Sequence, residues 1–247
     1  MLETLRTARG VMRSLGIYYG RRQRQRTRAM DALYGQFVRP NDLAFDVGSH
    51  VGDRIAAFRR LKARVVAVEP QPALAFTLNM LYGRDKNVTI ERVAIGRAPG
   101  AIELKVNLDN PTISTASDAF VQAARDARGW EGQAWDKKLR VPMTTLDALI
   151  ARHGKPAFIK IDIEGFEEEA LLGLTQPVPA LSFEFTTIQR DVARACVARC
   201  VLLGMTRFNA ALGESQVLGE WRTADAIVRW VDALPHEANS GDIYAMA

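Results

Sequence analysis

The 247-residue sequence has few of the residues that build disulfide frameworks and metal centres. It contains two cysteines, Cys196 and Cys200, and three histidines, and they do not have the spacing of zinc ligands. We interpret both cysteines as buried small hydrophobic residues on one helix face, which fits a reducing compartment. A disulfide-stabilised secreted domain and a zinc-ribbon-like protein are thereby excluded.

Long apolar runs are also absent. No stretch reaches the roughly 18 apolar residues of a membrane span, and arginines interrupt every apolar stretch near the N-terminus, unlike a signal peptide. We therefore expect a cytoplasmic protein. Apolar residues make up 48% of the chain and charged residues 25%, as in globular proteins. One large α/β domain explains the length as well as two small ones.

Positive charge is concentrated in residues 1–28, which hold a net charge of +7, whereas the rest of the chain carries −2. The arginines of this segment are Arg6, Arg9, Arg13, Arg21, Arg22, Arg24, Arg26 and Arg28. Its apolar residues recur every three or four positions, as in an amphipathic helix, at Leu2, Leu5, Ala8, Met12, Leu15 and Tyr19.

We predict that residues 1–35 form a basic amphipathic arm outside a domain of residues 36–247. Three interpretations of the arm stay open. It packs on its own domain or on a partner subunit of a homo-oligomer, it contacts an anionic membrane at its inner face, or it binds nucleic acid. The slightly acidic body makes nucleic acid the least favoured partner.

Short apolar strands alternate with helical patterns from Pro40 onward. The strand patterns are 43–47, 64–68, 88–95, 101–106, 157–163, 180–185, 206–210 and 242–246. The helical patterns are 52–61, 73–82, 118–128, 145–153, 166–174, 191–203 and 224–234. This alternation predicts right-handed crossovers and a parallel sheet. The pattern loosens at about residues 97–141, which we interpret as an insertion over the edge or mouth of the sheet.

The segment Phe45–Asp53, FDVGSHVGD, joins a strand to a helix. Gly48 and Gly52 allow a tight turn and the close approach of a ligand. Glu69 lies at the end of the second strand, where an acid suits the two hydroxyls of a ribose. The segment therefore predicts a nucleotide-like cofactor.

Two cofactors compete for this turn. A dinucleotide requires glycine at the position of His50, and Asp46 would repel its pyrophosphate. Asp46 suits instead the cationic amino-acid end of S-adenosylmethionine. An ordinary strand–turn–helix without a ligand is the remaining alternative.

The second motif is FIKIDIEGF, residues 158–166. On a strand, Lys160, Asp162 and Glu164 share one face, and three charges at the end of an apolar strand are costly to bury without partners. We predict a functional site there, with a surface-edge strand or a structural Lys160–Asp162 pair as the alternative. Glu184 ends the next strand and is expected to face the same mouth as a weaker substrate-contact candidate. Two carboxylates are too few to assign a metal.

The sequence resembles the FkbM-type S-adenosylmethionine-dependent methyltransferases over roughly residues 36–247. The matching segments are FDVGSHVG (45–52), VEPQP (68–72), ERVAIG (91–96), VPMTTLDAL (141–149), FIKIDIEGFEEEALLG (158–173) and SGDIYAM (240–246). The resemblance implies a class I methyltransferase fold, a Rossmann-like, seven-stranded, mostly parallel α/β sheet with helices on both faces and an antiparallel last strand. It also implies methyl transfer to a hydroxyl, commonly on a sugar, a glycan or a polyketide-like metabolite.

The resemblance assigns roles to the cofactor candidates. Asp46, Gly48 and Gly52 would surround the methionine end of S-adenosylmethionine, Glu69 would hold the ribose, and Ala94 would neighbour the adenine. Three residues of the same two turns complete the cofactor-binding set, namely Ser49, His50 and Pro70.

Asp162 and Glu164 would face the acceptor. Asp162 is our first choice as the base or as the group that orients the hydroxyl, Glu164 is second, and Lys160 would tune either carboxylate. Because these candidates all lie beyond the arm, we expect residues 1–28 to be dispensable for cofactor binding. The rival functions are an RNA-binding protein or RNA methyltransferase that uses the arm, and a nicotinamide-dependent oxidoreductase.

Overall fold

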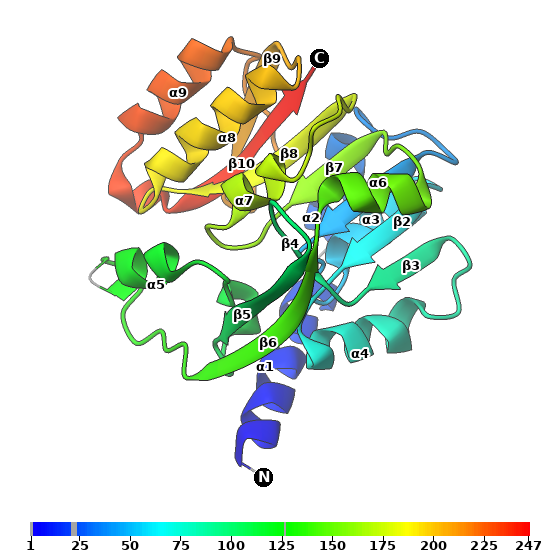
Figure 1. Ribbon diagram of the computed structural model, residues 1–247, viewed down its shortest axis with the longest axis vertical. Coiled ribbons are helices and arrows are strands. Elements are labelled where there is room, and N and C mark those ends of the chain that lie inside the picture. The colour runs from blue at the N-terminus through cyan, green and yellow to red at the C-terminus, as the bar shows by residue number, and fades with distance from the viewer. Residues whose placement is uncertain (1, 21–23, 126) are drawn as a thin grey trace.

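The computed structural model describes residues 2–20, 24–125 and 127–247, and its centre is a seven-stranded sheet of order β3-β2-β1-β7-β8-β10-β9 (Figure 1). The strands are β1 (Leu43–Val47), β2 (Arg64–Val68), β3 (Val88–Glu91), β7 (Phe158–Ile161), β8 (Ala180–Thr186), β9 (Arg207–Leu212) and β10 (Ser240–Met246). The β1–β2, β1–β7, β2–β3 and β7–β8 pairs are parallel. Strand β10 runs antiparallel to β8 and β9, between which it lies. The expected mostly parallel sheet with an antiparallel last strand is confirmed.

Helices cover both faces of this sheet. One face carries α6 (Leu146–His153), α7 (Glu167–Leu172), α8 (Arg190–Leu202) and α9 (Ala224–Ala233), and the other carries α2 (Arg24–Tyr34), α3 (Asp53–Arg60) and α4 (Pro72–Tyr82). In β1, Phe45 and Val47 pack toward the first group and Ala44 toward the second. Because both faces are covered, the central strands are nearly continuous apolar runs.

The predicted insertion forms a smaller sheet of order β4-β6-β5. Its elements are β4 (Ala94–Ile95), β5 (Gly100–Val106), the 3-10 turn η1 (Pro111–Ile113), α5 (Asp118–Arg125) and β6 (Lys137–Thr144). The prediction of a single strand over 88–95 is therefore wrong, because β3 pairs with β2 in the large sheet and β4 pairs with β6 in the small one. Strand β6 was not predicted, since Lys138 and Arg140 alternate with its apolar residues and resemble a solvent-exposed loop.

The arm begins with α1 (Leu2–Tyr19), which confirms the expected helix. The first half of its apolar stripe does not face the domain, however, because Leu5 and Met12 are 65% and 67% exposed, whereas Tyr19 at the end of the stripe contacts the domain. The side toward the domain carries small residues, and a Cβ on Gly10 would lie 2.7 Å from the Leu108 carbonyl oxygen. Figure 1 shows α1 projecting from one end of the molecule.

The second half of the arm packs into the body. Met30, Leu33 and Tyr34 of α2 are buried in the core with α3. The helix α2 is therefore packed as part of the domain core, whereas we had expected it in the arm. The division of the chain at residue 35 stays a prediction. Arg21 and Arg22 lie outside the described residues.

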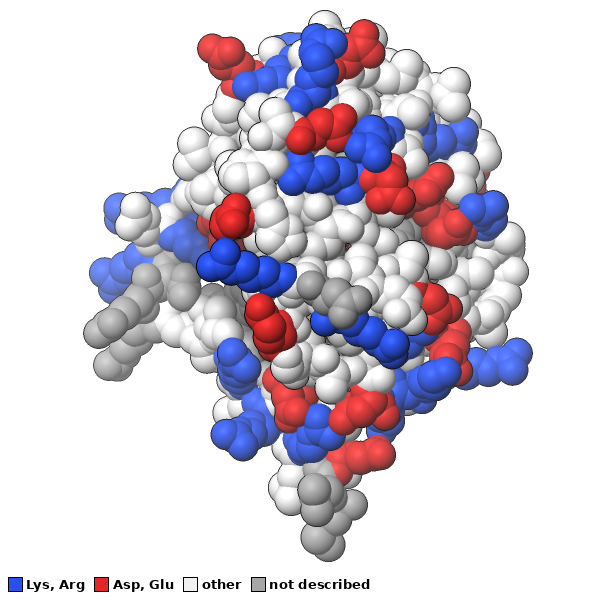
Figure 2. Space-filling model, turned by 90° about the vertical axis from the view of Figure 1, so that its left-hand side faces the viewer, with Lys and Arg blue, Asp and Glu red and all other residues white. Residues whose placement is uncertain are grey.

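Two surface properties complete the fold. Among the described residues, no helix combines the length and the hydropathy needed to cross a bilayer. Figure 2 shows acidic and basic side chains interspersed over one face of the molecule, down to the end from which α1 extends. There Arg6 bonds to Asp109 and to Asp136, each at 2.5 Å.

The 3-10 turn η2 (His236–Ala238) leads into β10.

Candidate functional site

The turn after β1 lies against the turn after β7. Gly48 has a φ of +85°, and a Cβ at this position would lie 1.8 Å from the carbonyl oxygen of Asp162. The amides of Gly48 and Ser49 both donate to the carbonyl of Val68, at 2.9 and 3.0 Å. Glycine at position 48 is thus required for the two turns to meet at the carboxyl edge of the sheet.

The rest of this turn leads into α3. Ser49 donates its hydroxyl to the carbonyl of Asp46 at 2.7 Å, and His50 adopts a left-handed φ of +49°. Gly52 is also left-handed, at +88°, and a Cβ there would lie 2.6 Å from the Tyr82 ring. These bonds and conformations orient the backbone of the turn toward the neighbouring β2 turn.

Glu69 is held by that backbone. One of its carboxylate oxygens accepts from the amide of His50 at 3.0 Å, and the other accepts from the amide of Gln71 at 2.8 Å. Burial raises the pKa of Glu69 to about 8, although the two amides oppose the shift. Each oxygen retains accepting capacity for one further donor, such as a ligand hydroxyl.

A pocket opens between these turns and the insertion. Its lining includes Glu69, Pro70, Ala94 and His50 from the predicted cofactor set. The remaining lining comes from the β1, β2 and β4 segments, from the insertion and from the segment after β7, and consists of Gly48, Gln71, Ile95, Leu104, Pro111, Thr112, Ser114, Ala116, Asp162, Ile163 and Phe166. We call this the β2 pocket.

A second, more polar pocket adjoins it, which we call the acidic pocket. Four residues line both pockets, namely Gly48, His50, Thr112 and Asp162. The acidic pocket adds Tyr18, Asp46, Asp53, Arg54, Lys160, Glu164, Glu184 and Glu214. A group that spans the β2 pocket therefore reaches a molecule in the acidic pocket across Asp162.

The three predicted carboxylates of this region come together. One oxygen from each of Asp162, Glu164 and Glu184 lies within 4.8 Å of the others. Glu164 reaches this cluster in a different way from the one we expected. Strand β7 ends at Ile161, so Glu164 does not lie on the strand, and its own left-handed backbone conformation, with φ +56°, places it there. The carboxylates can share a cation, a proton or the hydroxyls of a ligand, and we assign no metal to them.

Their charges are unequal. Burial opposes ionisation of Asp162, but Lys160 and Arg54 outweigh it and lower the pKa of Asp162. Burial, and then the charge of Asp162, raises the pKa of Glu164 and that of Glu184. At neutral pH the negative charge of this cluster therefore resides first on Asp162.

Lys160 holds Asp162 in place. Its ammonium group is buried and donates to Asp162 at 3.1 Å and to Asp242 of β10 at 2.7 Å. Burial alone would lower the pKa of Lys160, but the two carboxylates raise it. The Lys160–Asp162 pair that we considered as an alternative is present, and it lies at the site.

Asp46 is buried beside this pair, at 2% exposure, and its Oδ2 has no partner within the described part of the chain. Burial, followed by the neighbouring Asp53, raises the pKa of Asp46 to about 7. His50 is similar, because its Nε2 is buried without a described partner and burial lowers the pKa of the ring to about 4. Both side chains have capacity for a ligand.

Several residues that line the two pockets were not predicted from the sequence. Thr112 and Ser114 lie in the polar segment of the insertion, whose position over the mouth was the available signal. Tyr18 and Glu214 gave no signal, because they reach the pocket from distant segments. Tyr18 and Arg26 also show that part of the arm, expected to be separate from the site, lies against it.

Three known proteins are similar to this chain in sequence or in fold. The Hexuronic acid methyltransferase AglP of Haloferax volcanii is 27% identical over 157 residues, which cover 62% of this chain and 58% of that protein. A TehB-like SAM-dependent methyltransferase from Corynebacterium glutamicum superposes with TM-score 0.44 and 11% identity, over 94% of this chain and 98% of that one. Aeropyrum pernix fibrillarin, solved with bound S-adenosyl-L-methionine, gives TM-score 0.43 and 9% identity, over 88% and 73%.

The decisive match is to a family model. The model of the Methyltransferase FkbM domain matches residues 46–197, which contain both turns and the three carboxylates. The chain therefore belongs to the FkbM methyltransferase family.

Proposed function

We propose that the protein is an S-adenosylmethionine-dependent O-methyltransferase that acts on a hydroxyl of a sugar or glycan. The observation that carries the proposal is the pair of adjoining pockets with Asp162 in both linings. When bound, S-adenosylmethionine supplies an electrophilic methyl group on a sulfonium. The protein then has to align an oxygen of the acceptor and receive its proton.

The residues of the β2 pocket fit the cofactor. In its ionised form Glu69 would accept from the ribose hydroxyls through both oxygens, and Ala94 and Pro70 would border the adenosine. The methionine end would reach into the adjoining acidic pocket, where the unpartnered Oδ2 of Asp46 would accept from its ammonium group. Gly48 and Gly52, with Ser49 and His50, would let the backbone approach that end closely.

In the acidic pocket we assign proton acceptance to Asp162. Its lowered pKa keeps it ionised at neutral pH, and Lys160 fixes its orientation. Glu164 is the alternative base, because its raised pKa makes its ionised form the stronger proton acceptor. Glu184 would orient a second hydroxyl. Aligned in this way, the acceptor hydroxyl would lose its proton to a carboxylate while its oxygen takes the methyl carbon, whose bond to the sulfonium sulfur breaks to leave S-adenosylhomocysteine.

Two observations support a sugar as the acceptor, namely the carboxyl groups of the acidic pocket and, more distantly, the similarity to AglP. AglP is described as a hexuronic acid methyltransferase, but the match spans only 58% of its length. In our chain, Glu164 and Glu184 have no cationic partner within 4.0 Å among the described residues. The ionised Asp162 beside them repels an anionic acceptor, and all three carboxyl groups can hydrogen-bond neutral hydroxyls, so we expect an uncharged sugar.

The test combines binding with turnover. Calorimetry should show S-adenosylmethionine binding that weakens by about 1–3 kcal/mol in Asp46→Ala or Glu69→Ala, while NAD fails to bind. Formation of S-adenosylhomocysteine is then measured with neutral methyl glycosides, methyl uronates and hydroxylated polyketides. Unchanged affinity in both variants would remove the cofactor assignment, and activity on polyketides alone would replace the sugar.

We also propose that α1 contacts an anionic membrane surface. The support is its exposed apolar stripe, with Leu5 and Met12, beside Arg9 and Arg13, which form no ion pair in the described ranges. Apolar residues flanked by unpaired cations suit a bilayer with anionic headgroups. Truncation of the arm is expected to weaken binding to anionic liposomes, whereas a change of oligomeric state would favour subunit contact instead.

A further inference from the structure

The N-terminal arm contributes a residue to the lining of the acidic pocket. The ring of Tyr18, near the end of α1, lines this pocket and meets the ring of His50 edge-on, at 5.6 Å between centroids. Asp162 and Glu184 lie among the other lining residues. An aromatic ring from one segment thus shares a pocket with carboxylates that follow or lie on two strands of the sheet.

The end of α1 is fixed against the cofactor turn. The hydroxyl of Tyr19 lies 3.0 Å from the carbonyl oxygen of Val51 and 2.6 Å from the hydroxyl of Tyr82. Tyr82 in turn donates to the carbonyl of Gly52 at 2.9 Å. These contacts place the neighbouring Tyr18 at a defined position over the turn.

The start of α2 is fixed there too. The guanidinium of Arg26 stands 4.9 Å from the centroid of the Tyr18 ring and bonds to Asp53 at 2.6 Å and to Glu214 at 2.8 Å. Arg54 bonds to the same two carboxylates, at 2.8 and 3.2 Å. The arginines are largely buried, so this network joins α2, α3 and the segment after β9 around the ring.

Tyr18 makes no hydrogen bond through its hydroxyl within the described ranges. The packing therefore uses its ring, and the lining of the pocket combines this aromatic side chain with carboxyl groups. A sugar has matching surfaces, because its C–H groups pack on an aromatic ring and its hydroxyls donate to carboxylates.

We propose that Tyr18 binds the acceptor, as an aromatic platform that holds a neutral sugar ring with its hydroxyls toward Asp162, Glu164 and Glu184. This inference rests on the proposed methyl transfer to a sugar. It makes the arm a part of the acceptor site, and it makes Arg26 a positioning residue that acts through the Tyr18 ring.

The experiment compares Tyr18→Ala and Tyr18→Phe in the full-length protein. The probes are methyl glycosides of glucose, galactose and mannose, assayed by S-adenosylhomocysteine formation after wild type has identified the best acceptor. Tyr18→Ala should raise KM for that acceptor about tenfold, with kcat and the calorimetric affinity for S-adenosylmethionine within about twofold of wild type. Tyr18→Phe keeps the ring and should restore wild-type KM.

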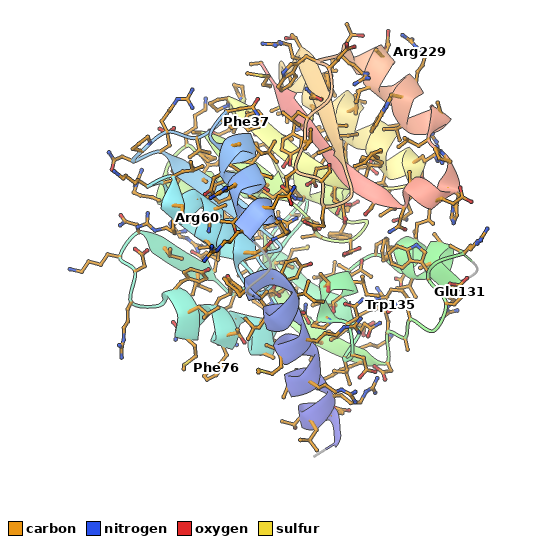
Figure 3. The ribbon with its side chains drawn as sticks, turned by 180° about the vertical axis from the view of Figure 1, so that it is seen from behind. Phe37, Arg60, Phe76, Glu131, Trp135 and Arg229 are labelled. Atoms are coloured by element: carbon orange, nitrogen blue, oxygen red, sulfur yellow. The ribbon has the colours of Figure 1, made fainter. Side chains whose placement is uncertain are left out.

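Phe76→Ala is the matched control, because Phe76 is an aromatic residue of α4 that points into solvent at 67% exposure, and the variant should leave KM unchanged (Figure 3). If thermal melting shows that Tyr18→Ala is unfolded, Tyr18→Leu retains apolar volume without a ring and should show the same rise in KM. Wild-type KM in the ringless variants, or a loss confined to kcat or cofactor affinity, overturns the inference while methyl transfer stands. If wild type binds S-adenosylmethionine but methylates none of the sugars, the proposed function fails and the inference with it.

Discussion

Replacing Asp162 by asparagine separates its chemistry from its place in the fold. The amide has nearly the shape of the carboxylate but is a far weaker base. Lys160 keeps its shorter bond, 2.7 Å to Asp242, so one carboxylate still neutralises the buried ammonium. We therefore expect a folded variant that binds S-adenosylmethionine and loses roughly 10²–10⁴-fold in turnover, equivalent to about 2.7–5.5 kcal/mol of barrier.

Asp242→Asn is the matched control. It removes the other partner of Lys160, but Asp242 is not part of the acidic pocket lining. This variant should lose about 1–3 kcal/mol of folding free energy, measured by urea unfolding, because a buried charged hydrogen bond is weakened. Its turnover at a temperature where it is folded should stay within about threefold of wild type. Near-normal turnover in Asp162→Asn, or equal losses in both variants, would leave Asp162 as a structural residue only.

Three further predictions address the cofactor turn, the pH dependence and the arm. Gly48→Ala should abolish S-adenosylmethionine binding, because its Cβ would clash with the carbonyl oxygen of Asp162. The control is Gly132→Ala, where φ is +76° but the space around the Cβ is open. It should cost only about 1 kcal/mol of folding free energy and leave the calorimetric affinity for S-adenosylmethionine intact. The pKa of Glu69 is about 8 in the folded protein and 4.5 as its ordinary value, so its protonation stabilises the fold below pH 4.5 and this contribution is lost as the pH rises to 8. The melting temperature should therefore fall less between pH 5 and pH 8 in Glu69→Gln than in wild type, and parallel curves would contradict the shift. Serine at both Leu5 and Met12 of α1 should reduce co-sedimentation with phosphatidylglycerol vesicles, whereas Leu202→Ser on α8, at 77% exposure, should not. Equal loss in both proteins would contradict a role for α1.

Much of the sheet was predictable because its strands are buried on both faces and bounded by glycine or proline. The same pattern failed at Val88–Ile95, since a sequence of strand-forming residues does not reveal a change of partner sheet. For the arm, periodicity predicted the helix of residues 2–19 but not which side packs. Small residues such as Gly10 allow close approach of α1 to the domain, so Leu5 and Met12 of the apolar stripe are left exposed.

In the site, too, local motifs could be predicted from the sequence, whereas contacts that depend on tertiary packing could not. Glycines and acids in local motifs marked the turns after β1, β2 and β7, because backbone conformation and ligand chemistry restrict residue type there. Glu164 was selected for alternation on a strand, yet a left-handed turn positions it. Tyr18 reaches the pocket from an otherwise ordinary helix, and that depends on tertiary packing alone.

The position of β10 has a consequence for the order in which the protein matures during synthesis. This strand follows β8 and β9 in the chain but lies between them in the sheet, and it carries Asp242, the nearer partner of Lys160. A nascent chain that has not yet emerged from the ribosome as far as residue 242 therefore has an unpaired β8 edge and an under-neutralised ammonium beside Asp162. The electrostatics of the site are completed last, so an interrupted translation product should present an aggregation-prone edge rather than a working enzyme.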